Sequence, residues 1–224
     1  MSAHLCQIEM IDRKPCGRAV SRNRTCIFHL VDKTGEEALL FDRELTKELE
    51  RIERNPQIGS VDFSRFVFPG ETDFSERIFE KGIILYAAEF KKNAGFAETT
   101  FLKEVNFART KFVEDVSFLG VKFNEKAIFY NAAFKKRVSF TDATFKGQAD
   151  FSGAVFGERS VFIGTSFGED VDFSATTFEG EADFTEAKFQ KQASFVDAAF
   201  EKTYIFFDAK FREQPDFSGS NVRI

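Results

Sequence analysis

Three cysteines and a histidine near the start of the chain have the residue types of a metal site. Cys6, Cys16 and Cys26 are all of the cysteines in the 224-residue sequence, and His29 is one of its two histidines. Three thiolates and one imidazole complete the tetrahedral ligand set of a structural zinc ion and leave no position for water. Cys26 and His29 form a short-spaced ligand pair, whereas nine residues separate each cysteine from the next. The pattern predicts a structural zinc site.

Two alternatives to this zinc site remain open from the sequence. His4 is the other histidine and could replace one of the four ligands, or the three cysteines could be free, reduced thiols. A disulfide framework is excluded because three cysteines cannot all pair. A segment of about thirty residues is too short for a hydrophobic core of its own. We therefore expect residues 1–32 to form a small module that a metal ion holds together.

The rest of the sequence offers little for catalysis. With His29 assigned to the metal, only His4 remains as an imidazole for acid–base chemistry. The chain has no glycine-rich phosphate loop, no nucleophile elbow and no histidine-based metal motif with an open position. Aspartate and serine recur at regular intervals beside phenylalanine, and that regularity is typical of turn residues that bond the local backbone. We do not expect an enzyme.

The segment after the cysteines predicts a helix within residues 33–60. Thr34 and Glu37 have the spacing of a capping box, and Asn55-Pro56 ends the pattern. Apolar residues at helical spacing follow the capping box: Ala38, Leu39, Phe41, Leu45, Leu49 and Ile52. We expect a helix over about residues 35–54 whose apolar stripe covers the start of the next domain, rather than a partner.

Phenylalanine dominates the remaining chain, residues 61–224. The sequence has 32 Phe against three Tyr and no Trp, and 28 of the 32 follow the rule Phe-x4-Phe-x5-Phe with a period of 11. Leu85 replaces one Phe of the series, and Phe28, Phe41, Phe66 and Phe207 lie outside it. A small or β-branched residue mostly stands two positions before each Phe, as Ala127 does before Phe129. Such a period is the signature of a repeat architecture.

The alternating steps of five and six residues fit neither a helical stripe nor a long amphipathic strand. They fit short extended segments, each with a small residue and a Phe pointing inward, joined by tight turns. Two 11-residue units then close one four-sided coil of about 22 residues, and residues 61–224 make about seven coils. Stacked coils pair at strand spacing, so each Phe lies on the Phe of the coil below. The pattern predicts an all-β solenoid.

The repeats resemble the pentapeptide-repeat family. Ala149-Asp150-Phe151-Ser152-Gly153 and Ala182-Asp183-Phe184-Thr185-Glu186 match its signature of a small residue, Asp or Asn, Leu or Phe, and two variable residues. The resemblance covers about residues 61–221 and implies a right-handed quadrilateral parallel β-helix. Alternate units of six residues depart from the signature and imply a second turn type. The first thirty residues are also similar to Cys- and His-containing stretches, ending in Cys-Ile-Phe-His, that precede the repeats in some members.

Charge and hydropathy bound the location and the partners. The net charge of −5 and the pI of about 5.3 do not favour direct nucleic-acid binding. The longest notable apolar run, residues 83–88, is too short to span a membrane. Charged residues, among them Glu9 and Lys14, occupy the segment where a signal peptide is apolar. We therefore expect a cytoplasmic protein that does not bind membranes.

Acidic residues are concentrated in one part of the repeats. Residues 147–187 have a net charge of −8 and form an acidic belt about two coils tall. The belt comprises Asp150, Glu158, Glu169, Asp170, Asp172, Glu179, Glu181, Asp183 and Glu186. The family resemblance implies an alternative function here, because some pentapeptide-repeat proteins imitate duplex DNA and modulate DNA gyrase, a type II topoisomerase. A belt beside nearly neutral neighbours is thin for that role, which needs negative potential along the rod.

Outward apolar residues are the other candidates for a partner surface. Four pairs flank inward Phe or Leu positions: Ile84 and Tyr86, Ile128 and Tyr130, Val161 and Ile163, Ile205 and Phe207. With 22 residues per coil, the first two pairs share one side of the solenoid and the last two share another. Only residues 218–224 follow the last Phe, so we expect the C-terminal coil to lack a helical cap and to pair with a second copy in a homodimer. The sequence thus favours a non-enzymatic protein-interaction scaffold whose partner it does not name.

Overall fold

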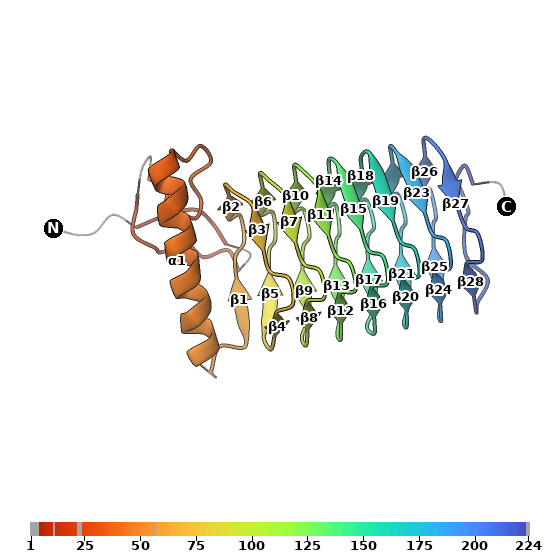
Figure 1. Cartoon of the computed structure of the whole chain (residues 1–224), viewed down its shortest axis with the longest axis horizontal. Coiled ribbons are helices and arrows are strands. Elements are labelled where there is room, and N and C mark those ends of the chain that lie inside the picture. Colours follow the sequence, from red (N-terminus) through yellow and green to blue (C-terminus); the bar gives the residue numbers. More distant parts are fainter. Residues whose placement is uncertain (1–4, 11, 22–23, 56, 223–224) are drawn as a thin grey trace.

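The computed structural model describes residues 5–10, 12–21, 24–55 and 57–222. Within these residues, one helix, α1 (Gly35–Arg54), precedes 28 short strands that form four parallel sheets of seven strands each. Figure 1 shows α1 lying across one end of a rod of stacked coils, with β27 and β28 at the other end. The structure confirms the four-sided β-solenoid, the N-terminal helix and the coil count.

The four sheets are the four sides of the solenoid, numbered here in chain order. Side 1 contains β1 (Ser60–Asp62), β5 (Gly82–Ile84), β9 (Val105–Asn106), β13 (Ala127–Ile128), β17 (Ala149–Asp150), β21 (Val171–Asp172) and β25 (Ala193–Ser194). Side 2 contains β2 (Val67–Phe68), β6 (Glu89–Phe90), β10 (Lys111–Phe112), β14 (Ala133–Phe134), β18 (Val155–Phe156), β22 (Thr177–Phe178) and β26 (Ala199–Phe200).

The other two sides are built in the same way. Side 3 contains β3 (Thr72–Asp73), β7 (Ala94–Gly95), β11 (Val116–Ser117), β15 (Arg137–Ser139), β19 (Arg159–Val161), β23 (Glu181–Asp183) and β27 (Tyr204–Ile205). Side 4 contains β4 (Ile78–Phe79), β8 (Thr100–Phe101), β12 (Lys122–Phe123), β16 (Thr144–Phe145), β20 (Ser166–Phe167), β24 (Lys188–Phe189) and β28 (Lys210–Phe211). Paired residues are 22 positions apart on every side, as in Phe112 with Phe134.

Phenylalanine rings fill the interior in four ladders, one for each side. Phe129 stacks on Phe107 at 5.0 Å and on Phe151 at 4.8 Å between ring centroids, with interplanar angles of 6° and 5°. Across the core, Phe118 meets Phe129 edge to face at 5.6 Å. Leu85 interrupts the ladder of side 1, and a void of about 10 Å³ lies beside it. The rings and the small residues between them therefore occupy nearly all of the interior.

The two segment lengths correspond to two different turns. After the first Phe of a unit the chain makes a tight turn: the Ala132 N–H donates to Phe129 O at 2.9 Å, and Asn131 has a φ of 53°. A positive φ at this position is the mark of a type II turn. It recurs every 11 residues from Arg65 to Gly219 in the described chain, and never in the six-residue segments. The expected second turn type is therefore present.

The recurring Asp and Asn before the first Phe stabilise these turns. Asp150 Oδ1 accepts the Ser152 N–H at 3.0 Å, and Asn106 Oδ1 accepts the Ala108 N–H at 2.8 Å. The same bond recurs at other coils, for example between Asp172 and Ser174. These local bonds confirm the role expected from the sequence.

Helix α1 has the bounds and the capping box expected from the sequence. Thr34 Oγ1 accepts the Glu37 N–H, and a Glu37 carboxylate oxygen accepts the Thr34 N–H. Phe41, Leu45 and Ile52 are buried against the first coil. Leu39 was expected in the apolar stripe, but this was wrong, since it is 73% exposed. No helix in the described part of the chain is long and apolar enough to cross a membrane.

Lysine side chains attach α1 and the segment before it to the first coil. Lys81 Nζ donates to the carbonyl oxygens of Ile52 and Asn55, which lie at the C-terminal end of the helix. Carbonyls in the last turn of a helix lack the N–H partner four residues on, and a cation suits the helix dipole there. Lys33 Nζ donates to Leu30 O and Val67 O at 2.6 and 2.7 Å. The cap is thus fixed to β2 and to the turn before β5.

At the C-terminal end a single side chain takes the place of a strand. Asn221 Nδ2 donates to Phe200 O at 2.8 Å, and Asn221 Oδ1 accepts the Phe200 N–H at 2.9 Å. These are the backbone groups of β26 that a further coil would bind. Phe206, Phe211 and Phe217 end their ladders and are only partly buried. Sequence reasoning missed this cap, because one asparagine carries no periodic signal.

The ladders predict that removal of an inner ring lowers the free energy of unfolding far more than removal of an outer ring. Phe151 is fully buried between Phe129 and Phe173, so Phe151→Ala should lower the free energy of unfolding by about 3–5 kcal/mol through lost burial and a cavity. Phe207→Ala is the matched control and should cost about 0.5 kcal/mol or less, since Phe207 is 66% exposed. Denaturant unfolding measures both values. Equal losses in the two variants would contradict the ladder as the source of stability.

Candidate metal centre

The N-terminal segment folds back on itself and brings Cys6 and Cys16 together. Antiparallel bridges join Leu5 to Ala19 and Glu9 to Pro15. The Cys6 N–H donates to Arg18 O at 2.8 Å, and the Gly17 N–H donates to Cys6 O at 3.0 Å. Cross-strand neighbours lie about 5 Å apart, so the nine-residue gap between the two cysteines is closed by this pairing. The wide spacing therefore still permits a compact site.

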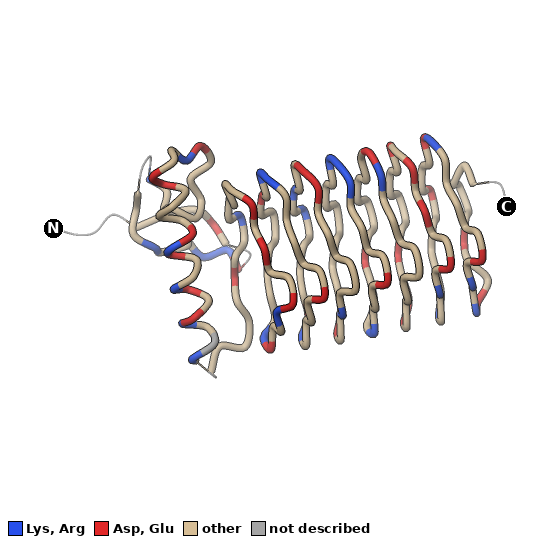
Figure 2. Tube along the Cα trace, in the orientation of Figure 1, with Lys and Arg blue, Asp and Glu red and all other residues tan. Residues whose placement is uncertain are grey.

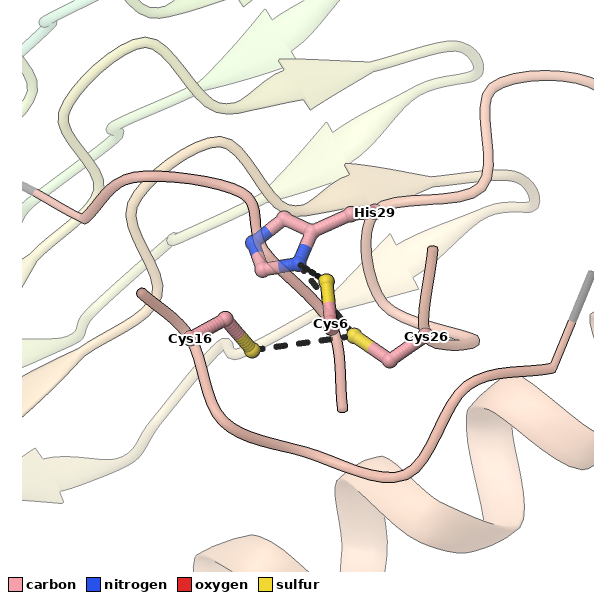
Figure 3. A group of neighbouring side chains, drawn as sticks. All are labelled: Cys6, Cys16, Cys26 and His29. Atoms are coloured by element: carbon pink, nitrogen blue, oxygen red, sulfur yellow. Dashed lines mark hydrogen bonds between the residues drawn. The ribbon is translucent and has the colours of Figure 1, made fainter. Parts of the chain in front are cut away.

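A tight turn supplies the other two side chains. The N–H groups of His29 and Leu30 both donate to Cys26 O at 3.1 Å, so residues 26–30 form one helix-like turn. Residues three apart in such a turn lie on the same side. Figure 3 shows Cys26 and His29 pointing toward Cys6 and Cys16. The structure brings together all four residues proposed from the sequence.

The distances between the four ligand atoms suit a tetrahedral metal ion. One donor atom from each residue lies within 4.8 Å of every other donor atom. Cys16 Sγ and Cys26 Sγ are 3.8 Å apart, and His29 Nδ1 lies 3.5 Å from Cys6 Sγ and 3.2 Å from Cys26 Sγ. Tetrahedral zinc with ordinary bond lengths places two sulfurs about 3.8 Å apart and sulfur and nitrogen about 3.5 Å apart. The cluster can hold a metal without rearrangement of the fold.

The burial and hydrogen bonds of the thiols also suit a metal site. Cys6, Cys26 and His29 are at most 4% exposed, and only Cys16 is partly accessible. A hydrogen bond with Cys26 is the largest cause that lowers the pKa of the Cys16 thiol well below its usual range, with further lowering by His29 and Arg18. The same bond raises the pKa of Cys26, with burial adding to the shift. The hydrogen bonds to Cys16 thus favour its thiolate, the form that binds a metal ion.

A hydrogen bond outside the cluster fixes the histidine ring for metal binding. His29 Nε2 lies 3.0 Å from Ser64 O, a carbonyl oxygen that can only accept. Nε2 therefore carries the ring proton, and Nδ1 presents its lone pair to the three sulfurs. Metal-binding histidines are usually oriented by such a bond from their second nitrogen. Ser64 lies just after β1, so the first coil of the solenoid orients a ligand of the N-terminal module.

Arg18 is a residue of the site that sequence reasoning missed. Its Nη1 lies 3.3 Å from Cys16 Sγ, and its Nη2 donates to Glu48 on α1 at 3.1 Å. The guanidinium also lies over the rings of Phe28 and Phe66, at 5.2 and 5.1 Å from their centroids. A cation in this place offsets the negative charge that three thiolates bring to the site. The only sequence signal was its position two residues after Cys16.

Three of the four Phe residues outside the 11-residue period connect this site to the solenoid. Phe28 stacks on Phe66 at 4.4 Å with an interplanar angle of 9°, and it meets Phe41 of α1 at 5.5 Å. The carbonyl of Phe28 accepts the Val67 N–H of β2 at 2.8 Å. The turn that carries two metal ligands therefore also pairs with β2 and covers the N-terminal edge of side 2. His4, the alternative ligand, lies outside the described residues.

The outward apolar pairs occupy two sides, as their spacing requires. Two pairs lie on side 1, Ile84 with Tyr86 and Ile128 with Tyr130, and two lie on side 3, Val161 with Ile163 and Ile205 with Phe207. One coil with Asn106 and Ala108 at the same positions separates the pairs on side 1, and one with Asp183 and Thr185 separates those on side 3. Tyr130 is 43% exposed and Phe207 is 66% exposed. Neither side carries a continuous apolar strip.

The acidic belt is spread around the rod, and several of its carboxylates have structural partners. Asp150, Asp172 and Asp183 accept backbone N–H groups of their turns. Glu181 pairs with Arg159 at 2.9 Å, and Glu158 pairs with Lys136 at 2.5 Å. The remaining members of the belt are Glu169, Asp170, Glu179 and Glu186. Figure 2 shows both basic and acidic residues distributed along the rod.

Comparison with known proteins identifies the repeats. The family described as "Pentapeptide repeats (9 copies)" matches residues 118–162, 129–177 and 162–210. No curated protein and no solved structure matches the chain. The matched residues belong to coils with unbroken ladders on all four sides. The repeats over residues 118–210 therefore match the pentapeptide-repeat family.

Proposed function

We propose that the protein is a non-enzymatic interaction scaffold, a rigid rod whose sides bind a protein partner and whose N-terminal end is closed by a zinc-held cap. One observation carries the proposal. The interior of the described coils is filled by stacked rings, and the void of about 10 Å³ beside Leu85 is too small for a substrate. Recognition then falls to the outward side chains of the four sides. A solenoid offers such extended binding surfaces.

The donor set supports zinc as the metal of the N-terminal cluster. Three sulfurs and one imidazole nitrogen are typical ligands of structural zinc, and they fill its tetrahedral shell. Cys6, Cys16, Cys26 and His29 would bind the ion, which supplies the cross-link that a module this small needs. Thiolates remain available for zinc only where they stay reduced, which supports the cytoplasm as the location.

The zinc proposal predicts one zinc ion per purified chain, measured by elemental mass spectrometry. Cys26→Ser should lose the ion, because it removes the ligand that lies between Cys16 and His29. His4→Ala is the matched control and should keep the ion, since His29 supplies the imidazole. Acidification should release the zinc as the thiolates and the imidazole take up protons. A chain that folds without zinc and resists EDTA would refute the proposal.

The apolar residues on side 3 are the best-supported surface for the partner. Phe207 is the one Phe of the described chain that is both outside the 11-residue period and largely exposed, at 66%. Ile205 lies beside it, and Val161 and Ile163 lie two coils away on the same side. Exposed aromatic residues are enriched at the centres of interfaces. Side 1 has a similar arrangement, but there the Arg109 guanidinium lies over the Tyr86 ring, 5.9 Å from its centroid, and so already contacts it.

An affinity pull-down from the native cell tests this surface. The wild-type chain should retain a partner that Phe207→Asp loses by about tenfold or more, because a charge would be buried in the apolar contact. Tyr130→Asp on side 1 is the matched control and should retain that partner. Cys26→Ser shows whether the metal module contributes to recruitment. Equal recovery with wild type and Phe207→Asp would exclude side 3 as the binding surface.

The C-terminal end supports a second contact, between two copies of the chain. Asn221 covers β26, whereas β27 and β28 have no following strand in the described residues. The rings of Phe206, Phe211 and Phe217 are half-covered there. A second copy placed end to end would cover these rings and pair the edges.

Self-association predicts a solution mass of twice the 25.5 kDa chain at tens of micromolar protein. Sedimentation equilibrium measures this mass, and dilution should shift it toward the monomer. A monomer at the highest soluble concentration would exclude the homodimer. The alternative function, modulation of DNA gyrase by DNA mimicry, has less support, because much of the acidic belt bonds turns or neighbouring cations.

A further inference from the structure

We propose that Cys16 and Cys26 are a site of oxidative modification: a hydroperoxide converts the two zinc-bound thiolates into a disulfide and thereby releases the metal. This inference rests on the proposed zinc site and concerns its regulation. It depends on which of the four ligands is accessible to a peroxide and on the charged residue beside that ligand.

The sulfur–sulfur contact within the cluster favours one pair of cysteines. Cys16 Sγ and Cys26 Sγ are 3.8 Å apart, and a disulfide needs about 2.05 Å, so the two sulfurs must approach by less than 2 Å. Cys6 Sγ lies within 4.8 Å of both other sulfurs, and its contact in the cluster is with His29 Nδ1, at 3.5 Å. Loss of the metal from between Cys16 and Cys26 leaves nothing to hold these two sulfurs apart.

Accessibility and charge favour Cys16 as the sulfur that reacts first. It is the one ligand that is partly accessible, whereas Cys6 and Cys26 are at most 1% exposed. Arg18 Nη1 lies 3.3 Å from its sulfur, and a guanidinium there stabilises the negative charge that develops on the departing oxygen. Glu48 and the two rings beneath the guanidinium keep it in this place.

The reaction balances with one hydroperoxide, ROOH. The Cys16 thiolate attacks the terminal oxygen, an S–O bond forms as the O–O bond breaks, and the departing alkoxide takes a proton from solvent to give ROH. The Cys26 thiolate then attacks the sulfenic sulfur, the S–S bond forms, and the hydroxide that leaves is protonated to water. Two thiolates are oxidised by two electrons, and the peroxide oxygens are reduced.

Release of the metal would also affect the solenoid, because the turn between Cys26 and His29 contacts its first coil. Two of four ligands are consumed by the disulfide, and one thiolate with one imidazole is too few for tetrahedral zinc. The same turn carries Phe28, which stacks on Phe66 and accepts the Val67 N–H. Oxidation should therefore loosen the cover over β2, and hydrogen exchange at the Val67 amide should become faster.

The experiment treats the purified full-length protein with hydrogen peroxide and follows three signals. A chromogenic chelator measures released zinc, differential alkylation with peptide mass mapping identifies the cysteines that pair, and hydrogen exchange reports on Val67. We expect zinc release to match Cys16–Cys26 disulfide formation, exchange at Val67 to rise, and dithiothreitol with added zinc to reverse all three. A disulfide that includes Cys6, or sulfinic acid without a disulfide, would overturn the proposal.

Two variants separate the role of Arg18 from its packing. Arg18→Met keeps much of the contact with the two rings and removes the charge, so disulfide formation should slow by about tenfold. Arg51→Met is the matched control, because Arg51 binds the same Glu48 without a contact to Cys16, and its rate should equal that of wild type. Equal rates in all three proteins would overturn the assigned role of Arg18. Absence of zinc from the untreated wild type would refute the zinc site. The cysteines found in the disulfide would still show whether Cys16 and Cys26 are the pair that is oxidised.

Discussion

Stacking of one Phe ring on another at the spacing of paired strands is the interaction on which the whole solenoid depends. Rings such as Phe118 and Phe140 lie 4.7 Å apart, which is also the distance between hydrogen-bonded strands. Backbone pairing and ring stacking therefore require the same distance between coils, and neither displaces the other. A coil of any other length would break both at once. This coincidence explains why one residue type recurs so strictly and why the rod has almost no empty interior.

Each inner coil pairs its backbone and its rings with the coils on both sides. The sequence therefore departs from its period mainly at the two ends of the solenoid. At the N-terminal end Phe28, Phe41 and Phe66 form a contact between helix, metal cluster and first coil. At the other end the amide of Asn221 binds the last backbone groups of side 2. Each device satisfies an edge that would otherwise pair with a foreign strand. The metal cluster is thus part of the closure of the solenoid, and its chemistry bears on whether that end stays covered.

The parts of the structure that follow from local or periodic rules were predictable, and those that depend on long-range contact were not. The Phe spacing predicts four sides and 22 residues per coil, and Thr34 and Glu37 predict the start of α1. Three cysteines and one histidine predict the metal cluster. No local rule places Arg18 between Cys16 and Glu48, or aims His29 at the carbonyl of Ser64. Leu39 was misplaced because it lies about 100° around the helix from Ala38, outside the buried stripe.

The 22-residue register also limits how such a chain can change its length. Loss or duplication of one 11-residue unit would keep every Phe in phase, since the two halves of a coil are alike in their interior. Every outward residue beyond that point would nevertheless move half a circuit, from side 1 to side 3 or from side 2 to side 4. The Val161 and Phe207 regions would then face opposite directions if the change fell between them. Only whole coils can be gained or lost while a binding surface keeps its direction, so surfaces of this kind should diversify in steps of two units.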